Sequence, residues 1–421
     1  MVVAAKIKLM NILIPTHYFS DEPLSGLHTV IWNTVKSLSD KGHSIYVIST
    51  FVKLNKESVK GLADKRIFVY RVINFQTHNL DKADSLAIFL RAITLRLFHK
   101  FDWIYIIDTS VTPFSRFKLG AKLACRVLSP KTPEAEVIFN GPDWSYDRAR
   151  KDFEENWQER IPPISYRLIR FLAEKLWFKV FPVNEIGKNA DIFFCQGKNT
   201  EKFYSEVSKS KIICLPNGVE DYRFDAVPAP VSDNRNFKYL FVGRIARRKG
   251  VFYLLEAFKK VADKHENVEL IIVGKGSDEL VAELKKKASG LLKDKKVRLL
   301  GELGRNEVIG LMKSADVIVD PMLYAGFSTV AAEGLYCKKP VIAPLFGGTG
   351  DFIKDGQNGF LVDARNVNDL ADKMEFYYSN PEIASGMAQE GYEYVKSNLT
   401  WDKVVGVIDK CFSDMLCRQV R

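Results

Sequence analysis

Two basic residues stand just after an apolar strand in the second half of the chain. The strand is the run 238–242, and Gly243, Arg244 and Lys249 follow it before a helical run over 251–262. Open α/β sheets bind ligands at the carboxyl ends of their strands. Arginine can grip a phosphate with two N–H bonds, and lysine adds a point charge. We therefore predict that Arg244 and Lys249 hold a phosphate group.

A second candidate phosphate site lies in the stretch 321–333. An apolar run over 315–320 predicts a buried strand, and apolar residues at helical spacing resume at 330. The turn between them contains Gly326, Phe327, Ser328 and Thr329, and either of the last two can serve as N-cap. The unpaired N–H groups and the dipole of such a helix start favour a phosphate. A strand–turn–helix without a ligand has the same pattern.

Together these two stretches resemble glycosyltransferase family 4, the retaining, nucleotide-sugar-dependent enzymes of glycosyltransferase group 1. The family pattern is Gly-Arg, then Lys-Gly, then two glutamates eight positions apart that flank a Gly-Phe turn. The matching residues are Gly243-Arg244, Lys249-Gly250, Gly326-Phe327 and Glu333. The resemblance covers most of the chain and is strongest from 238 to 363. It implies an α/β protein of the GT-B fold, with two Rossmann-like domains facing each other across a cleft.

The resemblance also implies roles for individual residues. Arg244 and Lys249 would be catalytic, because they stabilise the charge that grows on the departing nucleotide diphosphate. Glu333 would bind the ribose hydroxyls, since a carboxylate accepts from two donors. The implied donor-binding set is Gly26, Gly243, Gly326, Phe327, Ser328, Thr329 and Glu333. We find no Asp-x-Asp element, so neither a metal nor another cofactor is expected.

Two positions depart from the family pattern. Ala325 stands where the first glutamate contacts the donor sugar, and Asn140 stands where many members have a histidine. Asp143 and Asp320 are candidates for the missing acid. Asn140 and Asp143 are therefore candidates for contact with the sugar or the acceptor.

The elements that must position these residues form two α/β halves. In the first, a strand at 11–15, a polar loop at 16–25 and a helix at 27–38 form a Rossmann-like start, with Gly26 in the loop. In the loop between this strand and this helix, Gly26 either lies beside the nucleotide-sugar donor, as the resemblance implies, or makes a turn that binds no ligand. In the second, strands alternate with helices, which implies a parallel sheet covered on both faces.

Four segments follow from this organisation. Residues 1–218 form an acceptor-binding domain, 219–236 a linker, and 237–400 a nucleotide-sugar-binding domain. In this fold, the final segment, 401–421, is a helix that crosses back to the first domain.

The composition is that of a soluble globular protein. Of 421 residues, 47% are hydrophobic and 27% are charged, and no apolar run approaches the ~18–20 residues that span a bilayer. Six scattered cysteines without a Cys-x-x-Cys pair favour a reducing compartment over disulfides or zinc. The first ten residues are too short and too interrupted by lysine for a signal peptide. We expect a cytoplasmic protein.

The net charge of +11 allows an anionic partner. We find no nucleic-acid-binding module, and the lysines are dispersed. Arg91 and Arg96 lie on an apolar helix, and the stretch 164–183 mixes aromatic and basic residues. This stretch is either a monotopic membrane helix or a core helix with a basic outer face. Peripheral association with the inner face of an anionic membrane is therefore one expectation, and a solvated basic surface is the other.

Three classes of function remain open. The first is a retaining glycosyltransferase that moves a hexosyl unit from a nucleotide-diphosphate sugar to a lipid-linked, glycan or polysaccharide acceptor. The second is a non-catalytic relative that binds nucleotide sugar, because Ala325 and Asn140 depart from the pattern. The third is another GT-B enzyme, such as a nucleotide-sugar epimerase.

Overall fold

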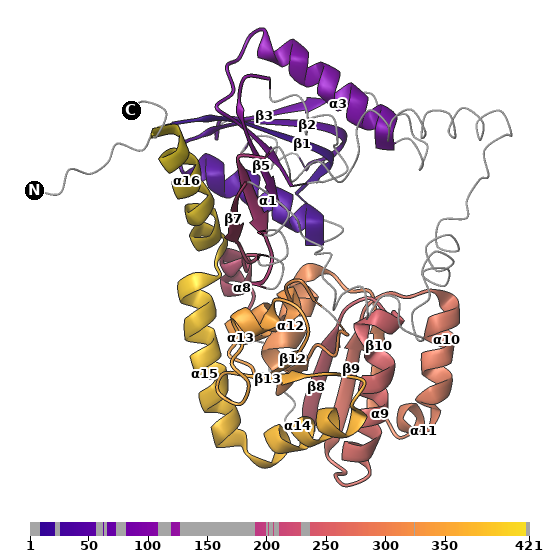
Figure 1. Ribbon diagram of the computed structural model, residues 1–421. Helices are drawn as coiled ribbons and strands as arrows, with labels where there is room; N and C mark the ends of the chain where they lie inside the picture. Colours follow the sequence, from indigo (N-terminus) through magenta and orange to yellow (C-terminus); the bar gives the residue numbers. More distant parts are fainter. Residues whose placement is uncertain are drawn as a thin grey trace, which may run out of the picture.

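The computed structural model folds into two parallel sheets, one in each half of the chain (Figure 1). It describes residues 9–21, 26–55, 62, 65–72, 81–107, 119–126, 190–198, 201, 205, 210–228, 236–323 and 325–417. The candidate residues Asn140 and Asp143 and the stretch 164–183 lie outside the described residues.

The first sheet has the strand order β3-β2-β1-β4-β5-β6-β7. Its strands are β1 (Asn11–Ser20), β2 (Ser44–Lys53), β3 (Ile67–Arg71), β4 (Trp103–Ile106), β5 (Lys122–Arg126), β6 (Ile192–Cys195) and β7 (Lys211–Cys214). Successive apolar residues of β1 point to opposite faces. Ile12 and Ile14 pack with α1 (Gly26–Asp40), whereas Leu13 packs with α3 (Asp81–Arg96). Both faces are therefore covered, as the continuous apolar runs of a parallel sheet require.

The second sheet has the order β10-β9-β8-β11-β12-β13 and carries most of the candidate site. Its strands are β8 (Phe237–Val242), β9 (Val268–Val273), β10 (Val297–Gly301), β11 (Val317–Val319), β12 (Val341–Pro344) and β13 (Phe360–Val362). Its helices are α9 (Val251–Ala262), α10 (Asp278–Lys287), α11 (Ser289–Lys293), α12 (Arg305–Ser314), α13 (Thr329–Tyr336), α14 (Val367–Ser379) and α15 (Pro381–Asn398). In β8, Tyr239 and Phe241 pack with α9 and α14, and Leu240 packs with α12 and α13.

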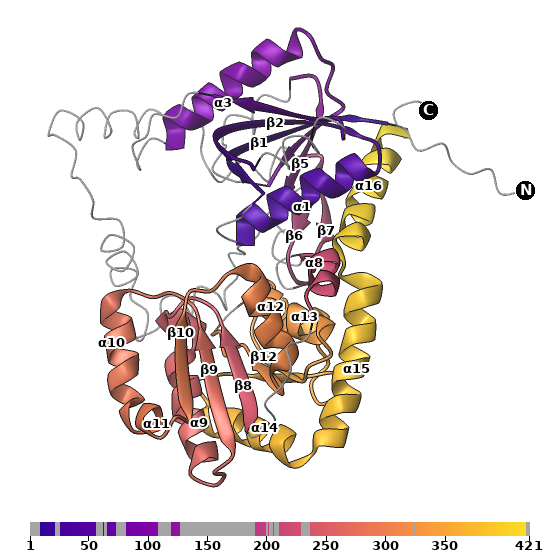
Figure 2. The same cartoon turned by 180° about the vertical axis from the view of Figure 1, so that it is seen from behind.

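The chain crosses between the two domains twice, and the crossings lie against each other. The Val219 N–H donates to the Leu399 carbonyl at 2.6 Å, and a Cβ on Gly218 would lie 2.6 Å from the Trp401 ring. The short helix α8 (Asp221–Ala226) follows the first crossing. Figures 1 and 2 show α15 and α16 (Trp401–Cys417) running along one side of both domains.

The last helix, α16, packs on the first domain. The ring of Phe412 stacks on that of Trp103 with centroids 4.2 Å apart. His43 is buried, accepts the Met10 N–H at Nδ1 and lies 3.0 Å from Asp409 through Nε2. Because Nδ1 accepts, Nε2 carries the proton and donates to Asp409. Apolar stacking and a long-range hydrogen bond thus tie the end of the described chain to the first sheet.

The expected polar loop at 16–25 is wrong in its first part, since β1 continues to Ser20. The extension pairs with β2 as far as Ser20 and Lys53, and the Tyr18 ring stacks on Phe51 at 4.7 Å. Pairing to a neighbouring strand outweighs the polar character of the segment.

No helix among the described residues is long and apolar enough to cross a membrane.

Candidate active site

The loop after β8 is fixed by contacts of its backbone. The Gly243 N–H donates to the Val273 carbonyl at 2.9 Å, at the end of the neighbouring strand. Gly274 has a φ of +143°, and a Cβ there would lie 1.9 Å from the Gly243 oxygen. Only glycine tolerates this conformation and this approach. The start of the loop that carries Arg244 is therefore held rigidly against the end of β9.

The far end of the same loop packs on the segment that leads to α13. Gly250 has a φ of +70°, and a Cβ there would lie 1.8 Å from the Pro321 oxygen. The Leu323 N–H donates to the Arg248 carbonyl at 3.1 Å. These contacts bring together the two stretches that the sequence singles out.

Lys249 lies in this contact and is half-buried, whereas Arg244 is exposed. The Nζ of Lys249 is 3.2 Å from the Met322 sulfur. Burial lowers the pKa of Lys249, the negative charge of Asp320 opposes this, and Arg248 and Arg244 lower the pKa further. The ammonium group of Lys249 has only a weak thioether acceptor and is repelled by its basic neighbours, so a bound anion would stabilise it.

The start of α13 is capped by Ser328 rather than by Thr329. The Ser328 hydroxyl oxygen accepts from the Ala331 N–H at 3.0 Å, and the hydroxyl donates to Oδ2 of Asp320 at 2.5 Å. Asp320 is buried at the end of β11, so it fixes the helix start to the sheet. The same carboxylate acts on Lys249. With this hydrogen bond, Asp320 acts as a support for the helix start.

The turn before α13 packs on the Gly347-Gly348 turn. Ala325 is 1% exposed, its N–H donates to the Phe346 carbonyl, and its own carbonyl accepts from the Gly348 N–H at 3.0 Å. A Cβ on Gly348 would lie 2.2 Å from the oxygen of Gly326. Close backbone approach thus explains both glycines of this turn.

The same turn contacts the first domain. Asp351 Oδ2 accepts from the Lys198 N–H at 2.9 Å, just after β6. Gly197, at a φ of +83°, leaves no space for a Cβ, which would lie 2.8 Å from the Cα of Gly348. The 347–351 segment therefore touches the candidate turn on one side and the first domain on the other.

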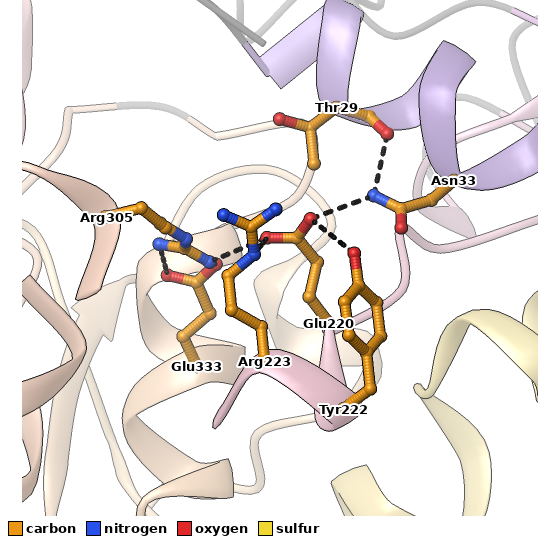
Figure 3. Close-up of polar contacts among 7 residues, drawn as sticks. All are labelled: Thr29, Asn33, Glu220, Tyr222, Arg223, Arg305 and Glu333. Carbon is orange, nitrogen blue, oxygen red and sulfur yellow. Dashed lines mark hydrogen bonds and ion pairs between the residues drawn. The ribbon is translucent and has the colours of Figure 1, made fainter. Parts of the chain in front are cut away.

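Glu333 is only 5% exposed and pairs with Arg305 (Figure 3). Nη1 of Arg305 donates to Oε2 at 3.1 Å, and Nη2 donates to Oε1. Nη2 also lies 3.4 Å from Oε2 of Glu220, which is 3% exposed. Burial alone would lower the pKa of Arg305, but Glu333 and Glu220 outweigh it and raise that pKa above its ordinary value.

The remaining predicted residues have clear places in the fold. Gly243 directly follows β8, Thr329 is the first residue of α13, and Gly26 is the first residue of α1. The Phe327 ring packs at 5.0 Å on Phe352. Gly243, Gly326 to Thr329 and Glu333 all belong to the second domain, whereas Gly26 belongs to the first.

Sequence reasoning missed Arg305 and Glu220. Arg305 begins α12. One signal was available, because Glu307 can reach back and accept from the Gly304 N–H, which it does at 2.8 Å. That capping pattern would have placed Arg305 in the first turn of a helix, but not its pairing with Glu333.

In the described part of the chain, no group of three or more His, Cys, Asp or Glu side chains is placed to hold a metal ion.

Part of the chain matches the model of a known protein family. Residues 224–394 match the model for glycosyl transferases group 1. The uncharacterized glycosyltransferase MJ1178 of Methanocaldococcus jannaschii is 31% identical over 238 residues, 54% of this chain and 60% of that protein. The D-inositol 3-phosphate glycosyltransferase of Arthrobacter sp. is 34% identical over 155 residues, 36% of this chain and 37% of that protein. The matched segments thus span 60% of the length of the first of these relatives and 37% of the length of the second.

Solved structures of the same fold cover nearly the whole chain. Anabaena Alr3699/HepE in complex with UDP has a TM-score of 0.69 at 17% identity and covers 96% of this chain and 100% of that one. Sucrose-phosphate synthase from Thermosynechococcus elongatus has a TM-score of 0.70 at 18% identity, over 97% and 100%. These similarities confirm the predicted α/β GT-B fold of two Rossmann-like domains. The match over 224–394 makes the second domain similar to the group 1 glycosyltransferases.

Proposed function

We propose that this protein is a glycosyltransferase that moves a hexosyl unit from a nucleotide-diphosphate sugar to an acceptor, with retention of configuration. One observation carries the proposal: the basic loop after β8 packs directly on the segment that leads to the start of α13. The contacts of Gly250 with Pro321 and of Lys249 with Met322 make this junction. Two kinds of phosphate-binding group, basic side chains and a helix N-terminus, thereby lie close together.

In this proposal, Arg244, Lys249 and the N–H groups at the start of α13 bind the diphosphate. Negative charge grows on the leaving diphosphate as the glycosidic bond breaks, and preorganised positive groups stabilise it. This set supplies the charge without requiring a metal. Glu333 binds the ribose hydroxyls, and Gly26 at the start of α1 lies beside the donor or the acceptor.

The acceptor is proposed to be lipid-linked, a glycan or a polysaccharide. Names of relatives support a small polar or lipid-bound acceptor: one is a D-inositol 3-phosphate glycosyltransferase and another a phosphatidyl-myo-inositol mannosyltransferase from Mycobacterium leprae. UDP and UDP-glucose in complexes of Anabaena Alr3699/HepE support a nucleotide-sugar donor.

A screen of nucleotide sugars by mass spectrometry tests this function. The protein is incubated with each donor, with and without lipid-linked and oligosaccharide acceptors. The amounts of free nucleotide diphosphate and of glycosylated product are then measured. Transfer or donor hydrolysis supports the proposal. Thermal stabilisation by a nucleotide sugar without any turnover would indicate the non-catalytic binder. A changed donor sugar without an acceptor would indicate the epimerase.

We also propose a peripheral, cytoplasmic location on an anionic membrane. The support is the exposed apolar end of α3 and the residues just after it, where Leu97 is 77% and Phe98 is 79% exposed, next to Arg91 and Arg96. Apolar insertion with basic flanks is how interfacial helices bind membranes. Anionic liposomes should sediment the protein at low salt and release it at high salt. Equal absence of sedimentation with anionic and neutral liposomes would point to a soluble acceptor.

A further inference from the structure

Four polar side chains connect the first domain with Glu333 (Figure 3). Asn33 belongs to α1, Glu220 lies at the first domain crossing, Arg305 begins α12, and Glu333 lies in α13. Nδ2 of Asn33 donates to Oε1 of Glu220 at 3.2 Å. Oε2 of Glu220 lies 3.4 Å from Nη2 of Arg305, which in turn grips Glu333. The series is continuous from one domain to the other.

The geometry of this series is restrictive. Asn33 uses Nδ2 twice, because it also donates to the Thr29 carbonyl at 2.9 Å. Arg305 meets both oxygens of Glu333 and packs over the Phe224 ring at 5.3 Å. A two-pronged arginine–carboxylate pair fixes the plane of the carboxylate as well as its position. The orientation of Glu333 is therefore set by Arg305.

The charges in the cluster hold Arg305 in place. Glu220 and Glu333 are both buried, and Arg305 lies between them, while Nε of Arg223 is 3.7 Å from Glu220. Removing Arg305 from Glu333 would leave a buried carboxylate without its charged partner, which is strongly unfavourable. Each carboxylate oxygen offers two lone pairs, so Glu333 can accept from Arg305 and from a hydroxyl at once.

We propose that Arg305 is the positioning residue of ribose recognition, and that Glu220 and Asn33 make its position depend on the first domain. The inference rests on the proposed function, in which Glu333 binds the ribose hydroxyls. Arg305 holds the two oxygens of Glu333 in the plane that the ribose meets. Glu220 holds Arg305 from the crossing, and Asn33 holds Glu220 from α1. A movement of α1 relative to the second domain thereby changes the preference of the site for ribose over deoxyribose.

The test measures discrimination against deoxyribose rather than affinity alone. UDP, GDP and ADP are titrated calorimetrically into the full-length protein, and the best binder is compared with its 2′-deoxy form. The ratio of the two dissociation constants is insensitive to partial unfolding, because misfolded protein lowers both apparent affinities equally. A merely structural role therefore leaves this ratio unchanged.

The wild type should prefer the ribose form by ~10–100-fold, the range for one hydrogen bond to a charged group. Glu333→Gln and Arg305→Gln should bring the ratio to within ~3-fold of unity. Arg305→Lys keeps the charge but cannot grip both oxygens, so it too should lose most of the preference. Arg298→Gln is the control, because Arg298 pairs with Glu269 elsewhere in the same domain and should keep the wild-type ratio.

Asn33→Leu tests the link to the first domain and should reduce the ratio ~3–10-fold. An unchanged ratio in folded Arg305→Lys and Arg305→Gln would overturn the role of Arg305. Loss in those variants with an unchanged Asn33→Leu ratio would overturn the link to the first domain. If the wild type binds none of the three diphosphates, the proposed function itself fails. If it binds them without preferring ribose, only the role given to Glu333 and Arg305 fails.

Discussion

The ammonium group of Lys249 lies 3.2 Å from the sulfur of Met322, at the contact between the basic loop and the approach to α13. A thioether is a weak acceptor, and the nearby Arg248 and Arg244 repel the positive charge. Lys249 therefore lies where an anionic ligand would be its strongest partner.

As pH rises, the affinity for nucleotide diphosphate should fall at a lower pH than it would if Lys249 had an ordinary lysine pKa. Burial lowers the pKa of Lys249, so the free protein loses this proton below the usual lysine range. The diphosphate binds the form of the protein in which Lys249 is protonated. Where Lys249 has lost its proton, binding therefore requires the protein to take up a proton. Calorimetry at increasing pH, up to the ordinary lysine pKa of ~10.4, should show affinity present at the lower pH and lost before that value is reached, because the Lys249 pKa is lowered. In Lys249→Met, affinity should be weaker and its pH dependence flatter; an equal slope in both proteins contradicts the assignment.

Gly347→Ala should destabilise the protein, whereas Gly350→Ala should not. Gly347 has a φ of +109°, and a Cβ there would lie 1.8 Å from the Ala325 oxygen. Backbone strain alone lowers the free energy of unfolding by ~1–3 kcal/mol. At Gly350 the nearest atom is 3.8 Å away, in ordinary contact. Denaturant unfolding compares the two variants, and equal stability would show that the two turns separate easily.

Ala325→Glu should leave nucleotide diphosphate affinity nearly unchanged and shift the preference among donor sugars. In the proposed function, Arg244, Lys249 and the start of α13 bind the diphosphate without contribution from position 325. Ala325 is buried, so the larger side chain should also lower stability by ~1–3 kcal/mol. Ala325→Gln has nearly the same size without the charge and separates the two effects. Loss of nucleotide binding in both folded variants would mean that this position does not lie beside the donor sugar.

Thiol reagents should label Cys417 first. It is exposed in α16, whereas burial raises the pKa of Cys195 to about 12 and that of Cys214 to about 11. The thiolate is the reactive form, and at pH ~8 it is then ~10⁻³ or less of either buried thiol. Cys417→Ser should remove the fast phase of a dithionitrobenzoate reaction. Fast labelling of Cys214 would instead indicate that its contact with Asp351 opens readily.

Strands of the second domain such as β8 and β11 could be predicted because each is a short, mostly apolar run with a buried centre. The predicted strand at 315–320 contains β11, and the predicted strand at 238–242 lies within β8. The strand β5 was missed, because Lys122 and Arg126 flank only three residues between them. Its place comes from parallel pairing with β4 and β6, which no local pattern reveals.

For the candidate site, the sequence shows which residues are present but not what supports them. The chemistry of Arg244, Lys249 and Ser328 follows from residue type and from strand ends. The partners Asp320 for Ser328 and Arg305 for Glu333 depend on contacts between separate elements. Only the folded chain brings these together, since the α12 start and α13 meet through tertiary packing.

The rate of donor turnover in Lys249→Ala tests the central claim most directly. The claim is that Lys249 stabilises the diphosphate as it leaves, so its loss should lower kcat by ~10²–10³, the scale for one preorganised charge donor. Lys260→Ala, on the exposed side of α9, is the matched control and should keep the wild-type rate. Release of nucleotide diphosphate is followed at saturating donor, with folding of both variants verified. A wild-type kcat in folded Lys249→Ala would contradict the account.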